Sequence, residues 1–257
     1  MDTVAVGNES RRKGMSEYLR EQLGYLPRQR DITNILKSID VERFKKIHSR
    51  FKDASPYPGW SKFLDMRKWI SRKIKAAHSL DLHKSEPLRI LDIGSGPGYF
   101  AYVCQHLGHE VVATDVGNNP LYNELIDLLG IERIVCTIKP LEPLPDYGTR
   151  FDLVTAQKAC FHIMDGEKDW DPQQWHDYLA ELTRCPDGKI WGVPQWRFFL
   201  RDLAENHISP GGRVHLNLNT DLEGHVFSGE LVEFFRSHGG SVDRKNVYFA
   251  SMAAFLD

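Results

Sequence analysis

LRILDIGSGPGYFAYVCQHLGHEVVATD is the sequence of residues 88–115, the stretch that decides the fold. An apolar run over 88–93 leads into three glycines, Gly94, Gly96 and Gly98. Apolar residues at helical spacing follow until Gly108, and a second apolar run ends at Asp115. The order strand, glycine loop, helix, strand and acid is typical of the first unit of a parallel sheet that binds a nucleotide-like ligand.

The glycine loop has specific physical properties. Glycines accept backbone angles that other residues avoid, and they let a ligand approach the main chain closely. Pro97 suits the first turn of the following helix, whose free N–H groups can hold a carboxylate or a phosphate. Asp115 lies about 20 residues past the first glycine, where an acid can accept hydrogen bonds from ribose hydroxyls.

Two classes of ligand fit this loop. A dinucleotide site requires G-x-G-x-x-G, whereas here the third glycine comes one residue early and Tyr99 takes the sixth position. Asp92 stands two residues before the first glycine. A carboxylate there suits a positively charged aminoacyl group and repels a pyrophosphate, because like charges repel. The dinucleotide interpretation is disfavoured but stays open.

The strand followed by D-x-G-x-G-x-G resembles the class I methyltransferases that depend on S-adenosylmethionine (SAM). The resemblance covers residues 85–257. It implies an α/β fold, with a Rossmann-like, seven-stranded, mostly parallel sheet that has helices on both faces. It also implies SAM as cofactor, with Asp115 on its ribose. Residues 1–84 then form an N-terminal helical cap. The residues expected to bind the cofactor are Asp92, Gly94, Ser95, Gly96, Gly98, Tyr99, Asp115, Val116 and Gln157.

The candidate for proton transfer follows the predicted fourth strand, residues 151–156. Ligands gather at the carboxyl end of such strands, and in the family that the chain resembles this strand points towards the transferred methyl group. Of the residues from Gln157 to His162, only His162 has a side chain that ordinarily titrates near neutrality. His162 can take a proton from a hydroxyl or amine acceptor, although a single histidine is more often structural.

The remaining pattern predicts the other elements. Helices are expected in the cap at 11–26, 33–51 and 61–78, and later at 120–129, 173–182, 194–207 and 229–238. Further strands are expected at 133–138 and 213–219, the latter after a Pro210–Gly212 turn, with a closing antiparallel pair near 242 and 247–255. After 133–138 many family members carry an acid for the adenine. Here Lys139, Pro140 and Leu141 stand in its place, so the adenine contact is left open between the backbone and Glu142.

Composition sets limits on compartment and cofactors. The four cysteines are scattered, without C-x-x-C or zinc spacing, which predicts reduced thiols in a cytoplasmic protein. The N-terminal stretch has no apolar signal-peptide centre, and no apolar run approaches the roughly 20 residues that span a bilayer. No metal site is expected, because Asn217 and Asn219 are poor ligands for a hard cation.

Charge is divided unevenly along the chain. Residues 1–87 contain 19 Lys and Arg against 11 Asp and Glu, whereas the remainder contains 14 against 24. A basic front half can meet nucleic acid, anionic lipid or a phosphorylated substrate. The favoured interpretation is a solvated helical cap that docks on an acidic body.

The sequence disfavours several classes of methyl acceptor but does not identify the acceptor. It lacks the N/D-P-P-Y pattern of amino-group methylation, the Pro-Cys pair of cytosine C5 methylation and any base-stacking RNA module. A small molecule accepting the methyl group on oxygen or nitrogen fits best, and nucleic acid is disfavoured but left open. The alternatives are an NAD-binding oxidoreductase and a non-catalytic module that binds SAM or RNA. The oligomeric state is not determined by the sequence.

Overall fold

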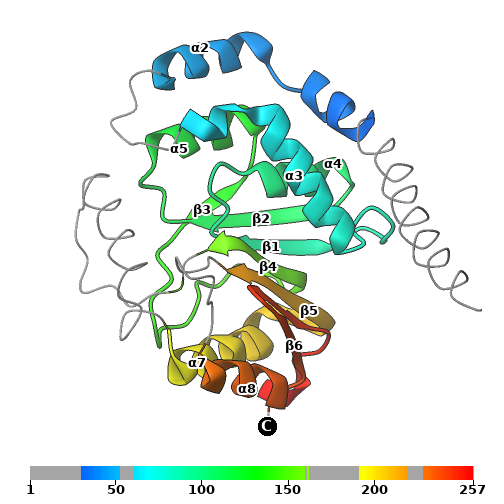
Figure 1. The fold of residues 1–257 in the computed structure, drawn as a ribbon, viewed down its shortest axis with the longest axis vertical. Coiled ribbons are helices and arrows are strands. Elements are labelled where there is room, and N and C mark those ends of the chain that lie inside the picture. Colours follow the sequence, from blue (N-terminus) through cyan, green and yellow to red (C-terminus); the bar gives the residue numbers. More distant parts are fainter. Residues whose placement is uncertain (1–29, 53–60, 160, 162–190, 219–227, 257) are drawn as a thin grey trace, which may run out of the picture.

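A seven-stranded sheet in the order β3-β2-β1-β4-β5-β7-β6 forms the centre of the protein (Figure 1). The computed structural model describes residues 30–52, 61–159, 161, 191–218 and 228–256. Helices cover both faces of the sheet, and further helices precede the first strand. The predicted fold class is therefore confirmed.

Five strands run parallel and two close the sheet in the opposite direction. The parallel strands are β1 (Arg89–Ile93), β2 (Glu110–Asp115), β3 (Arg133–Val135), β4 (Phe151–Ala159) and β5 (Ile208–Leu218). Strand β7 (Asn246–Phe249) pairs antiparallel with β5, and β6 (Gly240–Asp243) pairs antiparallel with β7. The central strands are rich in apolar residues, as expected of parallel strands covered on both faces.

Helices divide between the two faces of the sheet (Figure 1). On one face lie α3 (Met66–Ser79), α4 (Tyr99–His106) and α5 (Pro120–Leu129), which share one buried core with alternate strand residues such as Ile90 and Leu153. On the other lie α7 (Val193–Asp202) and α8 (Gly229–Ser237), packed on Leu91 and Val154. The two-residue period of the strands therefore supplies two separate cores.

The helices before β1 differ from the prediction of one helix over 33–51. Residues 30–37 are helical, and a second helix, α2 (Val41–Phe51), begins after Asp40. The Asp40 carboxylate accepts a hydrogen bond from Arg43 N at 2.9 Å, and Ser38 Oγ bonds back to Ile35 O at 2.6 Å. These contacts end one helix and cap the next, although the apolar spacing continues across the break.

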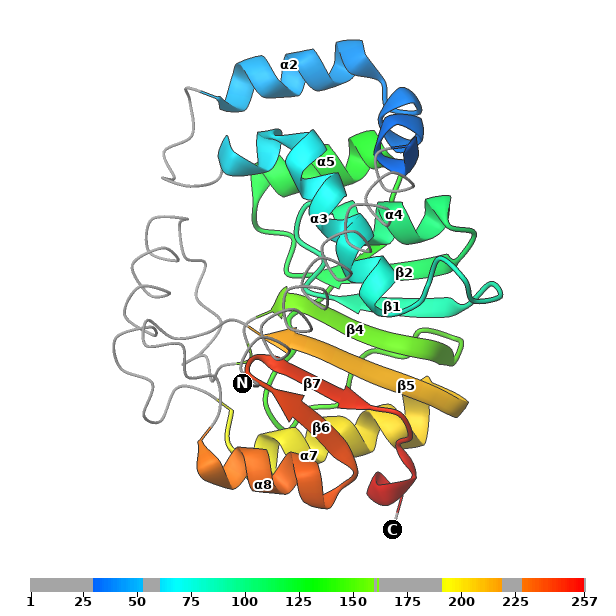
Figure 2. The same cartoon turned by 45° about the vertical axis from the view of Figure 1, so that its right-hand side comes forward.

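The prediction of one helix over 61–78 was wrong at its start. A short 3-10 helix, η1 (Ser61–Leu64), comes first, and Asp65 then caps α3 by accepting from Lys68 N at 3.1 Å. Figure 2 shows α2 above α5, remote from the sheet, where Arg50 pairs with Glu124 at 2.8 Å.

The predicted turn at Pro210–Gly212 lies inside β5. The pairing of β4 with β5 jumps from Phe151 opposite Ile208 to Leu153 opposite Arg213, so the turn residues bulge out of the ladder. Gly211 has a φ of +79°, which lets the strand absorb the extra residues. The prediction of a turn before the strand was therefore wrong, because residues 210–212 form a bulge within β5.

Other differences are in length and coverage. Strands β3 and β7 are shorter than predicted, whereas β4 extends to Ala159. The helix predicted over 194–207 is α-helical to Asp202 and continues as a π-helix, Leu203–His207. The helices predicted at 11–26 and 173–182 lie outside the described residues. Within the described part of the chain, no helix is long and apolar enough to cross a bilayer.

Candidate active site

Three strands end at the same edge of the sheet and bring the predicted site residues together. Ile93 of β1 lies opposite Thr114 of β2 and Ala156 of β4. The residues that follow, the loop 94–98, Asp115 and Gln157, therefore share the carboxyl edge of adjacent parallel strands. Ligands of open α/β sheets bind at this edge, where the strand order changes direction.

The glycine loop folds as a tight turn against Asp115. Gly94, Gly96 and Gly98 all have positive φ, at +65°, +55° and +78°. Ser95 N donates to Thr114 O at 3.0 Å, and Gly96 N donates to the Oδ2 atom of Asp115 at 2.8 Å. Asp115 is half-buried. One carboxylate oxygen thus fixes the loop, and the group remains accessible to a ligand hydroxyl.

Two of the glycines also sit where no side chain fits. A Cβ at Gly94 would lie 2.9 Å from Ala159 Cβ, and one at Gly98 would lie 2.6 Å from Ile126 Cδ1. The loop is therefore pressed against β4 on one side and against α5 on the other. This packing leaves the backbone of the loop as the surface that a ligand meets.

Asp92 is the most perturbed carboxyl group of the site. The side chain is fully buried, and neither of its oxygens has a hydrogen-bond partner among the described residues. Burial raises the pKa of Asp92 to about 7, although the positive charge of Lys73 acts to lower it. Lys73 comes from α3, is half-buried, and has its own pKa lowered by burial. A buried carboxylate without a partner stabilises a cation placed nearby.

The other predicted residues differ in what they offer a ligand. Ser95 Oγ is buried without a partner, and Val116 is 37% exposed. Tyr99 is buried, and its hydroxyl donates to Phe63 O at 2.6 Å. Burial raises the pKa of Tyr99 above its usual value, so this donor stays protonated. Tyr99 therefore ties the cap to the loop.

The acceptor side is described only in part. Gln157 is half-buried, and its Nε2 donates to Thr155 Oγ1 at 2.9 Å, so the amide side chain is held at the end of β4. His162, the candidate base, lies outside the described residues. Its catalytic role stays a prediction.

Two residues of this region were missed by the sequence analysis. Tyr122 of α5 lies beside the loop: a Cβ at Gly96 would be 3.6 Å from its ring, and its pKa is raised by burial and by the charge of Asp115. Its ring packs edge-on to Phe63 at 5.1 Å. Lys73 stands within the apolar spacing of α3, between Ile70 and Ala77. The one sequence signal that could have indicated Lys73 is a lysine placed among the regularly spaced apolar residues of this helix.

Comparison with known proteins finds methyltransferases. Residues 91–191 match the family model described as "Methyltransferase domain", and residues 10–134 match "Protein-L-isoaspartate(D-aspartate) O-methyltransferase". Two curated relatives are named ubiquinone biosynthesis O-methyltransferase. The one from Dinoroseobacter shibae is 34% identical over 124 residues, 46% of this chain and 45% of that protein. The one from Ruegeria pomeroyi is 33% identical over 102 residues, 38% and 41% respectively.

The matched regions thus span less than half the length of these two relatives. Among solved structures, the 1,6-didemethyltoxoflavin-N1-methyltransferase of Burkholderia thailandensis is 16% identical. That match covers 81% of this chain and 87% of the other, with a TM-score of 0.41. A likeness at this level adds nothing to the fold seen directly in the strand order.

Proposed function

We propose that the chain is a class I SAM-dependent methyltransferase, an active enzyme that binds SAM at the glycine loop and methylates a small-molecule acceptor. The observation that carries the proposal is the loop 94–98, with three glycines at positive φ and its backbone held by Asp115. The matched family model begins at residue 91, immediately before this loop.

The site residues fit SAM in charge and shape. Asp115 is proposed to accept hydrogen bonds from ribose hydroxyls; its Oδ2 atom accepts one from Gly96 N, which supports this role because it holds the carboxylate against the loop. Ser95 Oγ, buried and without a partner, is available to the aminoacyl end of the cofactor. The unpartnered oxygens of Asp92 provide negative charge behind the loop. Each of these features would contact a bound ligand that combines a positive charge with a ribose. The loop has no room for a side chain at Gly94 or Gly98.

Bound SAM supplies an electrophilic methyl group on a sulfonium sulfur. The protein then contributes mainly alignment of donor and acceptor. Gln157, held by Thr155 at the end of β4, is proposed to border the transferred group. His162 is proposed to take the proton when the acceptor is a hydroxyl.

Oxygen is the proposed attacking atom. The names of both curated relatives and of the longer family match contain the term O-methyltransferase. A hydroxyl acceptor also needs a base, which His162 can provide. Nitrogen as the attacking atom remains the alternative to be tested.

Calorimetric titration with SAM, S-adenosylhomocysteine and NADH tests the cofactor. We expect both SAM forms to bind and NADH not to bind. Asp115→Ala removes hydrogen bonds to a charged acceptor that are worth about 3 kcal/mol together, which corresponds to roughly a hundredfold loss of affinity. Asp152→Ala is the matched control, because Asp152 accepts from Arg89 N at the opposite end of the strands.

Two outcomes would contradict the proposal. Binding of NADH with no binding of SAM by the folded protein would favour the oxidoreductase. An affinity for SAM unchanged in Asp115→Ala would remove the carboxylate from the site. Once SAM binding is established, transfer of a labelled methyl group to a panel of phenols and amines identifies the attacking atom.

A further inference from the structure

A cluster of four cations lies beside the proposed cofactor loop, and we propose that it binds an anionic group on the methyl acceptor. We call Lys62, Arg72, Lys158 and Lys245 the cation cluster. Its members come from four places in the fold: η1, α3, the end of β4, and the turn between β6 and β7. This inference rests on the proposed function, since it assigns the substrate class of the same site.

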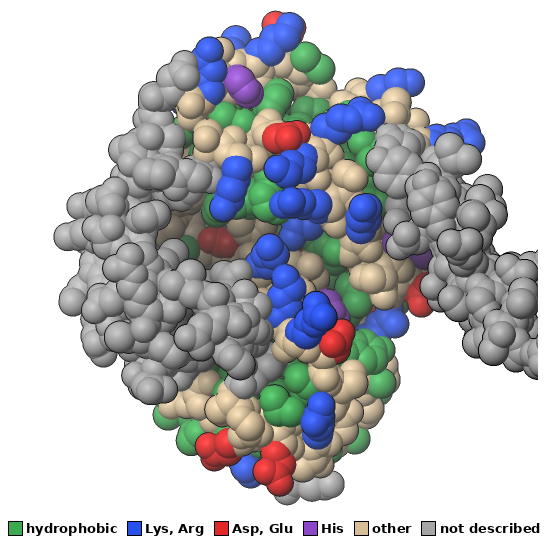
Figure 3. Space-filling model, in the orientation of Figure 1, with side chains coloured by type: hydrophobic (Ala, Val, Ile, Leu, Met, Phe, Trp, Pro, Cys, Tyr) green, Lys and Arg blue, Asp and Glu red, His purple; other side chains and the backbone are tan. Residues whose placement is uncertain are grey.

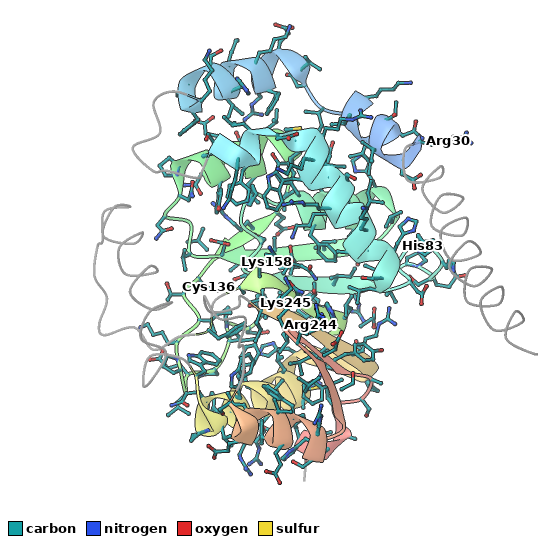
Figure 4. All side chains as sticks on the ribbon, viewed as in Figure 1. Arg30, His83, Cys136, Lys158, Arg244 and Lys245 are labelled. Carbon is teal, nitrogen blue, oxygen red and sulfur yellow. The ribbon has the colours of Figure 1, made fainter. Side chains whose placement is uncertain are left out.

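Several observations place the side chains of Lys62, Arg72 and Lys245 around Lys158. Burial and the charges of Lys245, Arg72 and Lys62 together lower the pKa of Lys158. Figure 4 shows Lys158 at the end of β4 and Lys245 in the β6–β7 turn, whose charge acts on Lys158. In Figure 3 a run of Lys and Arg side chains extends from α3 to that turn. Residues far apart in the sequence thus form one positive surface.

The backbone of Lys158 is held in an unfavourable conformation. Its φ is +66°, in the left-handed region that residues with a side chain rarely adopt. The β4–β5 register shifts between Gln157 and Ala159, and Ala159 packs beneath Gly94 of the cofactor loop. The kink therefore fixes the Lys158 side chain close to the site. Backbone strain of this kind is found where it serves binding or catalysis.

The cluster lacks a counter-charge among the residues that the structure describes. None of the four cations forms an ion pair there, although Lys45, Arg43 and Arg50 on α2 are all paired with acids. Arg72 lies over the ring of Trp69 at 4.9 Å, and Lys62 over Phe63 at 5.1 Å. Like charges gathered without an acid repel each other, so an anion that binds there relieves the repulsion.

The chemistry of the surroundings defines the ligand further. Gln157, Asn217 and Asn246 lie abreast across β4, β5 and β7, and Asn217 Nδ2 donates to Asn246 Oδ1 at 2.6 Å. The amides and the stacked rings of Phe63 and Trp69, 4.7 Å apart, border the cations. A compact acceptor that combines a ring with a carboxylate or a phosphate ester matches this combination of groups.

The experiment titrates benzoate, phenyl phosphate and neutral benzyl alcohol into the complex with S-adenosylhomocysteine, followed by calorimetry. We expect one of the anions to bind in the millimolar range or tighter and benzyl alcohol not to bind. Which anion binds more tightly distinguishes a carboxylate from a phosphate ester. Lys158→Gln/Lys245→Gln should weaken the anion about tenfold or more, with unchanged affinity for S-adenosylhomocysteine.

The matched control is Lys45→Gln/Lys46→Gln, which removes the same charge from α2. Equal loss of anion affinity in this control, equal binding of benzyl alcohol, or no anion binding at all would overturn the proposal. Binding of a single-stranded RNA that is lost in the Lys158/Lys245 variant, with no binding of the small anions, would assign the cluster to nucleic acid instead. If S-adenosylhomocysteine itself does not bind, the proposed function fails, and the anion titration without it still tests the cluster separately.

Discussion

Replacement of Asp92 by asparagine should make the ligand-free protein more stable, by an amount that grows with pH. The Asp92 carboxyl group is fully buried at the end of β1, and in the part of the chain that the structure describes neither oxygen has a hydrogen-bond partner. Burial raises its pKa from 3.8 to about 7. In the unfolded chain the same group ionises near its ordinary value. Between these two values the folded protein holds a proton that the unfolded chain releases.

The sign and size of the effect follow from this linkage. Because the folded state binds more protons between pH 4 and about 7, the free energy of unfolding falls as pH rises through that window. A shift of about 3 units corresponds to roughly 4 kcal/mol once the group is ionised in both states. About 1.5 kcal/mol of this has already been lost at pH 5, which leaves about 2.5 kcal/mol between pH 5 and pH 8. Asparagine does not titrate, so the Asp92→Asn variant avoids this loss.

Urea denaturation of the wild type and of Asp92→Asn at pH 5 and pH 8 measures the effect. The stability of the variant relative to the wild type should rise by about 2.5 kcal/mol between the two pH values. Any constant cost of burying the amide cancels in this comparison. Asp152→Asn is the control, because Asp152 is half-buried and accepts a hydrogen bond from Arg89 N. If the difference in free energy of unfolding between Asp92→Asn and the wild type does not change with pH, Asp92 is not a buried carboxyl group with a raised pKa.

Two further predictions concern the same loop. The affinity of the wild type for SAM should increase with pH through about 7, because a bound cation favours ionised Asp92. In Lys73→Met, calorimetry should find the midpoint of this increase at a higher pH, because the ammonium group that lowers the pKa of Asp92 is gone. An unchanged midpoint would argue against coupling between Lys73 and Asp92. Gly98→Ala should lower the free energy of unfolding by about 2 to 4 kcal/mol, since it combines positive φ with a clash against Ile126. Gly108→Ala, also at positive φ but with nothing within 4 Å, should cost less, and an equal cost by urea denaturation would mean that the clash is relieved.

The loop and the sheet could be predicted because their requirements are local. Positive φ at Gly94, Gly96 and Gly98 is a need of the backbone itself, and the sequence records it directly as glycine. Asp115 could be placed because a strand of known period brings its last residue to the same edge as the loop. Residues 210–212 were expected to form a turn before the strand, but whether such residues separate two elements or bulge from one strand depends on the neighbouring strand.

What could not be predicted depends on how distant segments meet. The break before α2 was hidden because the apolar spacing runs on through Ile39, whereas Ser38 closes the first helix and Asp40 caps the second. Lys73 near Asp92 requires the orientation of α3 on the sheet, which no spacing reveals. The cation cluster needs four elements at once. Only Lys62 and Arg72 lie in the positively charged residues 1–87; Lys158 and Lys245 lie in the acidic remainder, so the distribution of charge along the chain does not locate the cluster.

The contacts of the cap bear on how the chain should be divided. The boundary between residues 84 and 85 stays a prediction, and many contacts among the described residues cross it, including the following five. Tyr99 donates to Phe63 O, Tyr102 bonds to Ser38, Arg213 donates to Leu80 O, Arg50 pairs with Glu124, and Lys73 faces Asp92. Two of these involve residues of the cofactor loop or the strand that precedes it. Removal of residues 1–84 would leave the Tyr99 hydroxyl without its acceptor and the Asp92 charge without its only cation in the described part of the chain. A buried donor that loses its acceptor costs about 1 to 3 kcal/mol, and an unpaired buried charge costs more. In energetic terms, the cap therefore belongs with the proposed cofactor site, whatever boundary the sequence pattern suggests.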